Sequence, residues 1–287
     1  MELSCLNLKN LRAGMELCQI PVHRRVKLEQ FLEMHRQQIA EVVTAAELSC
    51  QHDGHFPVPM PQGLSEEELS LTATCAYCLL AEPSLLYFQQ KGYSKEHWLE
   101  IMPDLNGHAY DGADGSYWLD TVPRAFSWHC SILAADVIQL GRLQFQKINS
   151  PFDFPGLGIQ EGDLLMNMHI PALGPLDIDA CRESLRKAEE LFVPKFGAFK
   201  AFYCHSWLLN PVYRRYLSPT SNIIRFQELG IVIPHNNSLD RDALDRVFRN
   251  YHEDPFTATP RSALQRALQQ MVLRGESLSA AWMLIMR

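Results

Sequence analysis

The sequence lacks several short motifs that mark common enzyme classes. It contains no GxGxxG, no GxxxxGK[ST], no GxSxG, no HExxH and no second CxxC beside Cys75-Ala76-Tyr77-Cys78. These absences remove the simplest arguments for a dinucleotide-binding, P-loop, serine-hydrolase or zinc-protease site. The CxxC pair lies within an apolar run that is typical of a helix. We therefore expect buried thiols there rather than redox or metal chemistry.

Positive charge in excess and long hydrophobic runs are also missing. The chain has 26 basic and 33 acidic side chains, a formal net charge of −7, which argues against a dedicated nucleic-acid binder. The longest uncharged, largely apolar runs, Leu69–Ala81 and Leu164–Leu176, have 13 residues each, whereas a bilayer span needs ~20. Glu2 stands where a secretory signal would carry positive charge. We expect a cytoplasmic protein without a membrane partner, and the scattered cysteines fit a reducing compartment.

The first part of the chain, residues 1–137, has the pattern of a mostly helical domain. Seven apolar residues recur at helical spacing on one face: Leu28, Phe31, Leu32, Ile39, Val42, Val43 and Ala46. Ser65 and Glu68 have the spacing of a capping box, which predicts a helix that runs to about Ala81 and stops before Pro83. Further helices are predicted over Ser84–Lys91, Lys95–Met102 and Phe126–Leu140.

The pattern changes from Gly141 onward, and residues 138–287 are predicted to form a second domain. Strands are predicted over Arg142–Ile148, Asp163–Ile170, Lys200–Leu209 and Asn222–Leu229. Cys181, Leu185, Ala188 and Phe192 form a helical stripe, and another helix is predicted over Pro260–Arg274. Leu278–Met286 is left as a strand or a helix. The predicted fold class is α+β (α/β), with a helical domain followed by a strand-rich domain.

The segment from Asp163 to Phe192 is the most informative part of the sequence. A strand leads through a short Gly/Pro loop into a helix, whose first amides lack intrahelical partners and can bind an anion such as a diphosphate. The alternative is ordinary architecture. Asp177 can cap the helix itself, Asp179 would repel a phosphate, and Pro171 and Pro175 have no amide proton.

Two histidines lie near the ends of predicted strands. His169 shares a strand face with Leu165 and Asn167, and His205 shares one with Tyr203. If the two strands are neighbours, both imidazoles would flank one cleft, where a neutral imidazole suits general-base chemistry on an amine or hydroxyl. The alternative is that each is a hydrogen-bonded core histidine. A metal-dependent hydrolase that uses His52 and His55 is a further interpretation, although these two histidines lie in a Pro/Gly-rich stretch typical of a loop.

Several ordered motifs resemble a bacterial GNAT-like acyltransferase family, whose members join a mostly helical N-terminal N-acyltransferase domain to a GNAT-like C-terminal domain. The resemblance is carried by His169-Ile170-Pro171 with Gly174-Pro175-Leu176, by Cys204-His205-Ser206-Trp207-Leu208-Leu209, and by Ser221-Asn222-Ile223 with Arg225-Phe226. Gly141-Arg142-Leu143-Gln144-Phe145 and Ser262-Ala263-Leu264-Gln265-Arg266-Ala267 match as well. It extends from about Pro123 to Met271.

The resemblance implies a mixed sheet whose fourth and fifth strands splay apart to admit acyl-CoA. Asp163–Ile170 would be the fourth strand and Lys200–Leu209 the fifth. The residues implied in cofactor binding are Ile170, Pro171, Ala172, Leu173, Gly174 and Leu176. The loop departs from the usual [Q/R]-x-x-G-x-[G/A] pattern, because it has a single glycine between prolines and no arginine. Tyr213 and Tyr216 are the implied candidates for the general acid.

The resemblance therefore implies an enzyme that moves an acyl group, acetyl in the first instance, from acyl-CoA to an amine or hydroxyl of an unidentified acceptor. His205 or His169 would be the base and Tyr213 the acid, with acetyl-CoA or another acyl-CoA as co-substrate and no metal. The alternative is a non-catalytic ligand-binding or sensor protein on the same fold. Acceptor, acyl-chain length and oligomeric state stay open.

Overall fold

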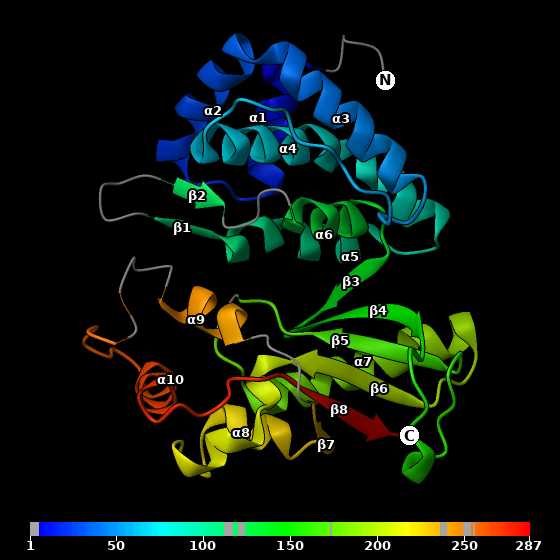
Figure 1. Cartoon of the computed structure of the whole chain (residues 1–287). Helices are drawn as coiled ribbons and strands as arrows, with labels where there is room; N and C mark the ends of the chain where they lie inside the picture. Colours follow the sequence, from blue (N-terminus) through cyan, green and yellow to red (C-terminus); the bar gives the residue numbers. More distant parts are fainter. Residues whose placement is uncertain are drawn as a thin grey trace. The chain divides into compact units, whose positions relative to one another are not determined.

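The computed structural model describes residues 6–111, 117–119, 124–172, 174–235, 240–248, 254 and 256–287. It combines helices with a mixed sheet, which confirms the predicted α+β class (Figure 1). The chain divides into two compact units, Met1–Gln139 with Pro171–Leu173 and Leu140–Ile170 with Gly174–Arg287. The domain boundary drawn from the sequence stays a prediction, since a compact unit is not by itself an independently folding domain.

The first unit is mainly helical. Its helices are α1 (Leu8–Leu17), α2 (Val22–Met34), α3 (Arg36–Cys50), α4 (Glu66–Gln90), α5 (Lys95–Ile101) and α6 (Arg124–Leu133). A 3-10 helix, η2 (Met102–His108), leads into an antiparallel pair of short strands, β1 (Ala109–Asp111) and β2 (Tyr117–Leu119). The seven residues of the predicted apolar face are all buried. They belong to two helices, however, because the backbone leaves helical geometry at His35, where φ is −117° and ψ is 28°.

Helix α4 is the central helix of this unit and packs against α1, α2, α3 and α6. It begins as predicted, because Ser65 and Glu68 form the capping box. The prediction that it ends before Pro83 is wrong, since the helix continues to Gln90. Ala81, two residues before the proline, has a carbonyl that accepts hydrogen bonds from the Trp98 indole (3.1 Å) and the Ser84 hydroxyl (2.6 Å). Residues on both sides of the proline, among them Leu80, Ala81 and Ser84, are buried, and such tertiary packing outweighs the local cost of an interior proline.

By length and composition alone, α4 could cross a membrane. Of its most hydrophobic 18-residue window, 72% is buried inside the structure. The helix therefore has the burial of a core helix packed among its neighbours.

The prediction of one helix over Phe126–Leu140 is wrong. Helix α6 stops at Leu133, and β3 (Val137–Leu140) follows. The reason is a turn in which Ala135 takes a positive φ of 55° and the Asp136 amide donates to the Ser131 carbonyl at 2.9 Å. A left-handed residue at this place terminates a helix.

A six-stranded mixed sheet in the order β3-β4-β5-β6-β8-β7 organises the rest of the chain. Its further strands are β4 (Leu143–Asn149), β5 (Leu164–His169), β6 (Ala201–Ser206), β7 (Ile231–Pro234) and β8 (Ala281–Met286). The connecting helices are η3 (Pro155–Leu157), α7 (Ile178–Phe196), η4 (Trp207–Leu209), η5 (Pro211–Arg215), α8 (Asn222–Gln227), α9 (Asp240–Phe248) and α10 (Ala263–Leu273). The strands predicted at β4, β5 and β6 and the helices predicted at α7 and α10 are confirmed, and Leu278–Met286 contains a strand.

The prediction of a strand over Asn222–Leu229 is wrong. The Ser221 hydroxyl accepts the Ile224 amide at 3.4 Å and caps the short helix α8. The strand of this region is β7, which follows α8 and pairs antiparallel with β8. The apolar residues of this segment, Ile223, Ile224, Phe226 and Leu229, do not alternate, and the capping serine marks a helix start.

Different segments of the chain pack against the two faces of this sheet. Helix α7 packs on the face that carries Phe145 and Phe202, and the ring centroids of Phe145 and Phe192 lie 6.2 Å apart. On the opposite face, Phe154 and Ile159 from the segment between β4 and β5 cluster with Leu165, Ala201, Tyr203 and Leu284. This second face is the one on which the candidate site lies.

Candidate functional site

His169 and His205 lie at the same end of neighbouring strands and on the same sheet face. Strands β5 and β6 are parallel, and they pair at two positions, Met166 with Phe202 and Asn167 with Tyr203. Within the described strands, β5 and β6 are not paired beyond Asn167 and Tyr203. Both histidines therefore lie past the last paired residues. The condition set by the sequence, that the two strands be neighbours, is confirmed. The catalytic roles of the histidines stay predictions.

The same face changes from apolar to polar along the strands. Its covered half holds Leu165, Tyr203 and Leu284. Toward the other end, cross-strand pairing places Gln144 opposite His169 and Trp282 opposite His205. A row of polar and aromatic side chains therefore crosses β4, β5, β6 and β8 where β5 and β6 stop pairing.

The ring of His169 is held by amide side chains. Its Nε2 atom lies 3.2 Å from the Asn167 amide nitrogen and 3.2 Å from Gln146 Oε1. Asn167 precedes it by two residues on β5, and Gln146 pairs with Asn167 across β4. These contacts fix the ring in place, which suits either a structural histidine or an oriented catalytic one.

His205 has a different environment. Its Nε2 atom is buried and has no hydrogen-bond partner among the described residues. Burial lowers the pKa of His205 from its usual 6.5, and the nearby His235, with ring centroids 5.9 Å apart, lowers it further. The Trp282 ring lies 6.2 Å from His205 and stacks on His235 at 4.2 Å. His205 is therefore neutral at pH 7, which is the state that can accept a proton.

The two tyrosines considered as general acid lie in different surroundings. Tyr213, in η5, is fully buried in an apolar cluster with Leu217, Ile224 and Met271, and burial raises its pKa. This placement favours a packing role, and its role as an acid stays a prediction. Tyr216 is half-buried, and its hydroxyl donates to Glu276 Oε1 at 2.9 Å.

The predicted diphosphate loop follows β5 directly. Ile170 is half-buried, Pro171 and Leu176 are buried, Ala172 and Gly174 are exposed, and Leu173 lies outside the described residues. Gly174 has a φ of +74°, and a Cβ placed there would meet no described atom within 4 Å. The loop thus presents accessible backbone at Gly174, as an anion-binding loop requires.

The helix start behind this loop is already capped. Asp177 Oδ1 accepts the amides of Asp179 (3.1 Å) and Ala180 (2.9 Å). The capping that the sequence offered as an alternative is therefore present. A donor diphosphate would have to rely on amides of the loop rather than on these two.

Sequence reasoning missed the cation beside this loop. Arg142 stands in the turn between β3 and β4, and its guanidinium donates to the carbonyls of Pro175 (Nε, 2.7 Å) and Gly174 (Nη2, 3.3 Å). Burial lowers its pKa, but a guanidinium stays protonated at neutral pH. The contact joins residues 32 and 33 positions apart, so no local pattern could reveal it.

The other histidines considered for metal binding do not converge. His52 packs against the Phe56 ring, and His55 Nε2 lies 3.8 Å from Asp136 Oδ2. No group of three or more His, Cys, Asp or Glu side chains suited to a metal occurs in the part of the chain that the structure describes.

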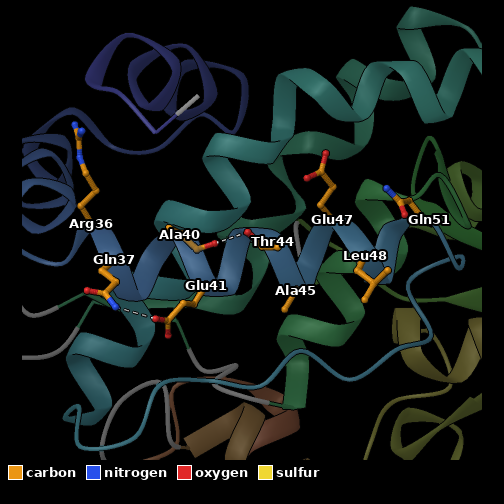
Figure 2. A pocket seen from close by; sticks show the side chains of 9 residues that line it. All are labelled: Arg36, Gln37, Ala40, Glu41, Thr44, Ala45, Glu47, Leu48 and Gln51. Carbon is orange, nitrogen blue, oxygen red and sulfur yellow. Dashed lines mark hydrogen bonds between the residues drawn. The ribbon is translucent and has the colours of Figure 1, made fainter. Parts of the chain in front are cut away.

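A separate depression of about 1000 Å³ lies on α3 in the helical unit (Figure 2). Its described lining consists of Arg36, Gln37, Ala40, Glu41, Thr44, Ala45, Glu47, Leu48 and Gln51. Gln37 donates to Glu41, and the Thr44 hydroxyl donates to the Ala40 carbonyl one helical turn earlier. None of these residues was predicted to have a role, and the histidines and the Gly174 loop do not line it.

Comparisons with known proteins agree with this geometry. The family model of the GNAT-like C-terminal domain matches residues 137–282. No curated protein matches the chain. Among solved structures, an acyltransferase in complex with decanoyl-CoA and teicoplanin is similar, with a TM-score of 0.75, 18% identity, and coverage of 96% of this chain and 87% of that chain. A mutant acyltransferase in complex with octanoyl-CoA has a TM-score of 0.75 and 18% identity, and the match covers 97% of this chain and 88% of the other. At this identity the likeness shows a shared fold.

Proposed function

The chain belongs to the family of proteins with a GNAT-like C-terminal domain, and from that premise we propose that it is an acyl-CoA-dependent acyltransferase. The observation that carries the proposal is the short pairing of β5 and β6, at Met166–Asn167 and Phe202–Tyr203, with His169 and His205 just beyond it. We propose that an extended donor binds between these strands where they stop pairing. Side chains able to move a proton stand at that opening.

The proposed reaction is direct attack on the thioester. A base removes a proton from the acceptor amine or hydroxyl, whose lone pair forms a bond to the acyl carbon. The carbon–sulfur bond of the thioester then breaks, and the CoA thiolate leaves and takes up a proton. Holding donor and acceptor together accelerates the reaction, and amides aimed at the thioester oxygen stabilise the charge that develops there.

His205 is our proposed base, and His169 is the alternative. A base must be neutral and must have an unoccupied nitrogen within reach of the acceptor. His205 Nε2 has no partner among the described residues, and the pKa of the ring is lowered by burial. His169 Nε2 is already contacted by Asn167 and Gln146.

The donor diphosphate is proposed to bind the loop after β5. Ala172, Gly174 and Leu176 have amide protons there, whereas the two prolines do not. The exposed backbone at Gly174 allows close approach. Similar structures contain octanoyl-CoA or decanoyl-CoA, and on that basis we propose a medium-chain acyl-CoA as donor in place of the acetyl-CoA first expected.

Calorimetric titration of the purified protein with free CoA, acetyl-CoA, octanoyl-CoA and decanoyl-CoA tests the donor. The variants Gly174→Asp and Gly174→Ala form a matched pair, because both place a side chain at φ +74°, where a Cβ meets no described atom within 4 Å, but aspartate alone repels a diphosphate. We expect saturable binding to wild type and G174A and its loss in G174D. No binding of any CoA species to wild type would refute the acyltransferase proposal, and tighter binding of acetyl-CoA would restore the first expectation.

A non-catalytic binding protein is the second candidate. It is favoured by the Asp177 carboxylate, which occupies two helix-start amides, and by the prolines that flank Gly174. It predicts that a bound acyl-CoA releases no thiol with any amine. The proposed enzyme instead releases free CoA when an amine panel is offered, as a thiol reagent would detect.

We propose the cytoplasm as the location of the protein. Support comes from Cys18, Cys50, Cys75, Cys78, Cys130, Cys181 and Cys204, which are all buried free thiols, as expected in a reducing compartment. Fractionation of the source cells with an antibody against the chain would test this.

A further inference from the structure

The turn between β3 and β4 is hydrogen-bonded to helix α7. Gly141 takes a positive φ of 72°, and the Ser184 hydroxyl accepts the backbone amides of Arg142 (2.8 Å) and Leu143 (3.3 Å). The same hydroxyl donates to the Ala180 carbonyl at 2.9 Å. Ser184 is fully buried, so the backbone that bears Arg142 is fixed relative to the start of α7.

From this fixed backbone the Arg142 side chain reaches two consecutive carbonyls of the donor loop. Nε donates to the Pro175 oxygen at 2.7 Å and Nη2 to the Gly174 oxygen at 3.3 Å. A guanidinium presents its donors in a rigid fork, so a two-point contact sets the orientation of both peptide planes, which a single ammonium could not do. In a trans peptide the C=O and N–H groups point in opposite directions. The Leu176 amide therefore points away from the guanidinium that holds the Pro175 carbonyl.

We propose that Arg142 is the positioning residue of the donor loop, holding the Pro175–Leu176 peptide so that the Leu176 amide donates to the diphosphate of acyl-CoA. This inference rests on the proposed function. It also explains how a loop without an arginine of its own can be shaped for an anion, since the cation comes from the β3–β4 turn. Arg142 acts through the loop and does not contact the reacting atoms.

If Arg142 positions the loop for the diphosphate, its replacement should weaken the use of donors that contain a diphosphate and should leave donors without one unaffected. The test compares octanoyl-CoA with octanoyl-pantetheine, which has the same thioester but no diphosphate, in wild type, Arg142→Gln and Arg142→Lys. For R142Q we expect KM for octanoyl-CoA and Kd for free CoA to rise about 10- to 100-fold, the range for losing charge-assisted hydrogen bonds. The kcat with octanoyl-CoA and the kcat/KM with octanoyl-pantetheine should stay within about twofold of wild type. R142K keeps the charge but loses the fork, so its Kd should lie between the two.

The matched control is Arg186→Gln, which removes the same charge from α7, where Arg186 pairs with Glu183 and Glu190 on the exposed side. It should bind CoA like wild type. If R142Q weakens both donors equally, or neither, while wild type binds CoA, the positioning role is wrong and the acyltransferase proposal stands. If R142Q fails to fold, R142K decides, because wild-type affinity in that variant would overturn the inference. Absence of CoA binding in wild type would instead remove the proposed function together with this role.

Discussion

His205 is the residue whose chemistry is most open to measurement. Because the pKa of His205 is lowered from its usual 6.5, the ring is neutral at pH 7. It gains a proton only when the pH falls through the lowered pKa. With His205 as base, kcat/KM should be flat near pH 7 and fall on the acid side. His205→Gln should lower kcat by about 10²- to 10⁴-fold, the usual contribution of a general base, and leave Kd for CoA unchanged. Stopped-time assays of CoA release from pH 5 to 8 measure both effects.

The control for this prediction is His169→Gln, which leaves an amide able to replace part of the contact with Gln146. A smaller loss of kcat in that variant, with the acid limb retained, would agree with His205 as the base. An H169Q variant that loses the acid limb while H205Q keeps it would reverse the assignment.

Among single residues, the sequence predicted the placement of the two histidines but not the contact that Arg142 makes. Alternation along a strand placed His169 and His205 on known faces, and the parallel register of β5 with β6 brought them together. The contact of Arg142 with the loop was not predicted, because its partners Gly174 and Pro175 are distant in sequence from the β3–β4 turn. Hydrogen bonds between a side chain and distant carbonyls have no period and leave no local signal.

At the scale of elements, the start of α7 can be tested through its cap. Asp177→Ala removes the acceptor for the Asp179 and Ala180 amides and should lower the free energy of unfolding by about 1 kcal/mol, as loss of a cap does. Asp177→Asn keeps a capping oxygen and should retain most of that stability. Urea unfolding measures the difference, and equal midpoints for D177A and wild type would contradict the capping role.

Helices α1 and α4 offer a second test, because their backbones touch. A Cβ on Gly14 would lie 1.8 Å from the Cys78 carbonyl oxygen. Gly14→Ala should therefore force the helices apart and lower the free energy of unfolding by about 1–3 kcal/mol or more. Gly156→Ala is the matched control, since a Cβ there meets nothing within 4 Å. Thermal unfolding should show a lowered midpoint for G14A alone, and an unchanged G14A would show that the two helices do not pack this closely.

Predictions of elements failed where a local signal was outweighed by its surroundings. Pro83 is a stop signal in isolation, yet α4 continues through it, with buried residues on both sides of the proline that pack into the core. Conversely, the Ser221 cap and the non-alternating apolar residues Ile223, Ile224 and Phe226 are helix signals in the sequence itself.

For the whole molecule, ligand binding should appear as added thermal stability. A ligand that binds only the folded chain stabilises it by about 2.7 kcal/mol at 100 times its Kd, which for a protein of this size raises the melting temperature by several degrees. Free CoA should produce this shift in wild type, and G174D, measured in parallel, should show none. Equal shifts in the two proteins would mean that CoA binds elsewhere.

The division of the chain into a helical part and a strand-rich part could be predicted from the spacing of its apolar residues. Apolar residues at helical spacing dominate the first part, and alternating residues begin after Gly141, where the six-stranded sheet lies. What sequence pattern could not supply was strand order. The crossover that puts β6 beside β5 and β8 between β6 and β7 depends on contacts remote in sequence.

The order of the first helices has a consequence for how the protein is made. Helix α4, apolar enough to resemble a membrane span, contacts α1, α2 and α3, and all three precede it in the chain. Because ribosomes extend a chain from its N-terminus at about 5–20 residues per second, these partners have left the exit tunnel before α4 emerges. The nascent chain can therefore begin to bury this apolar helix as it appears, before α6, which also packs against it, has been made.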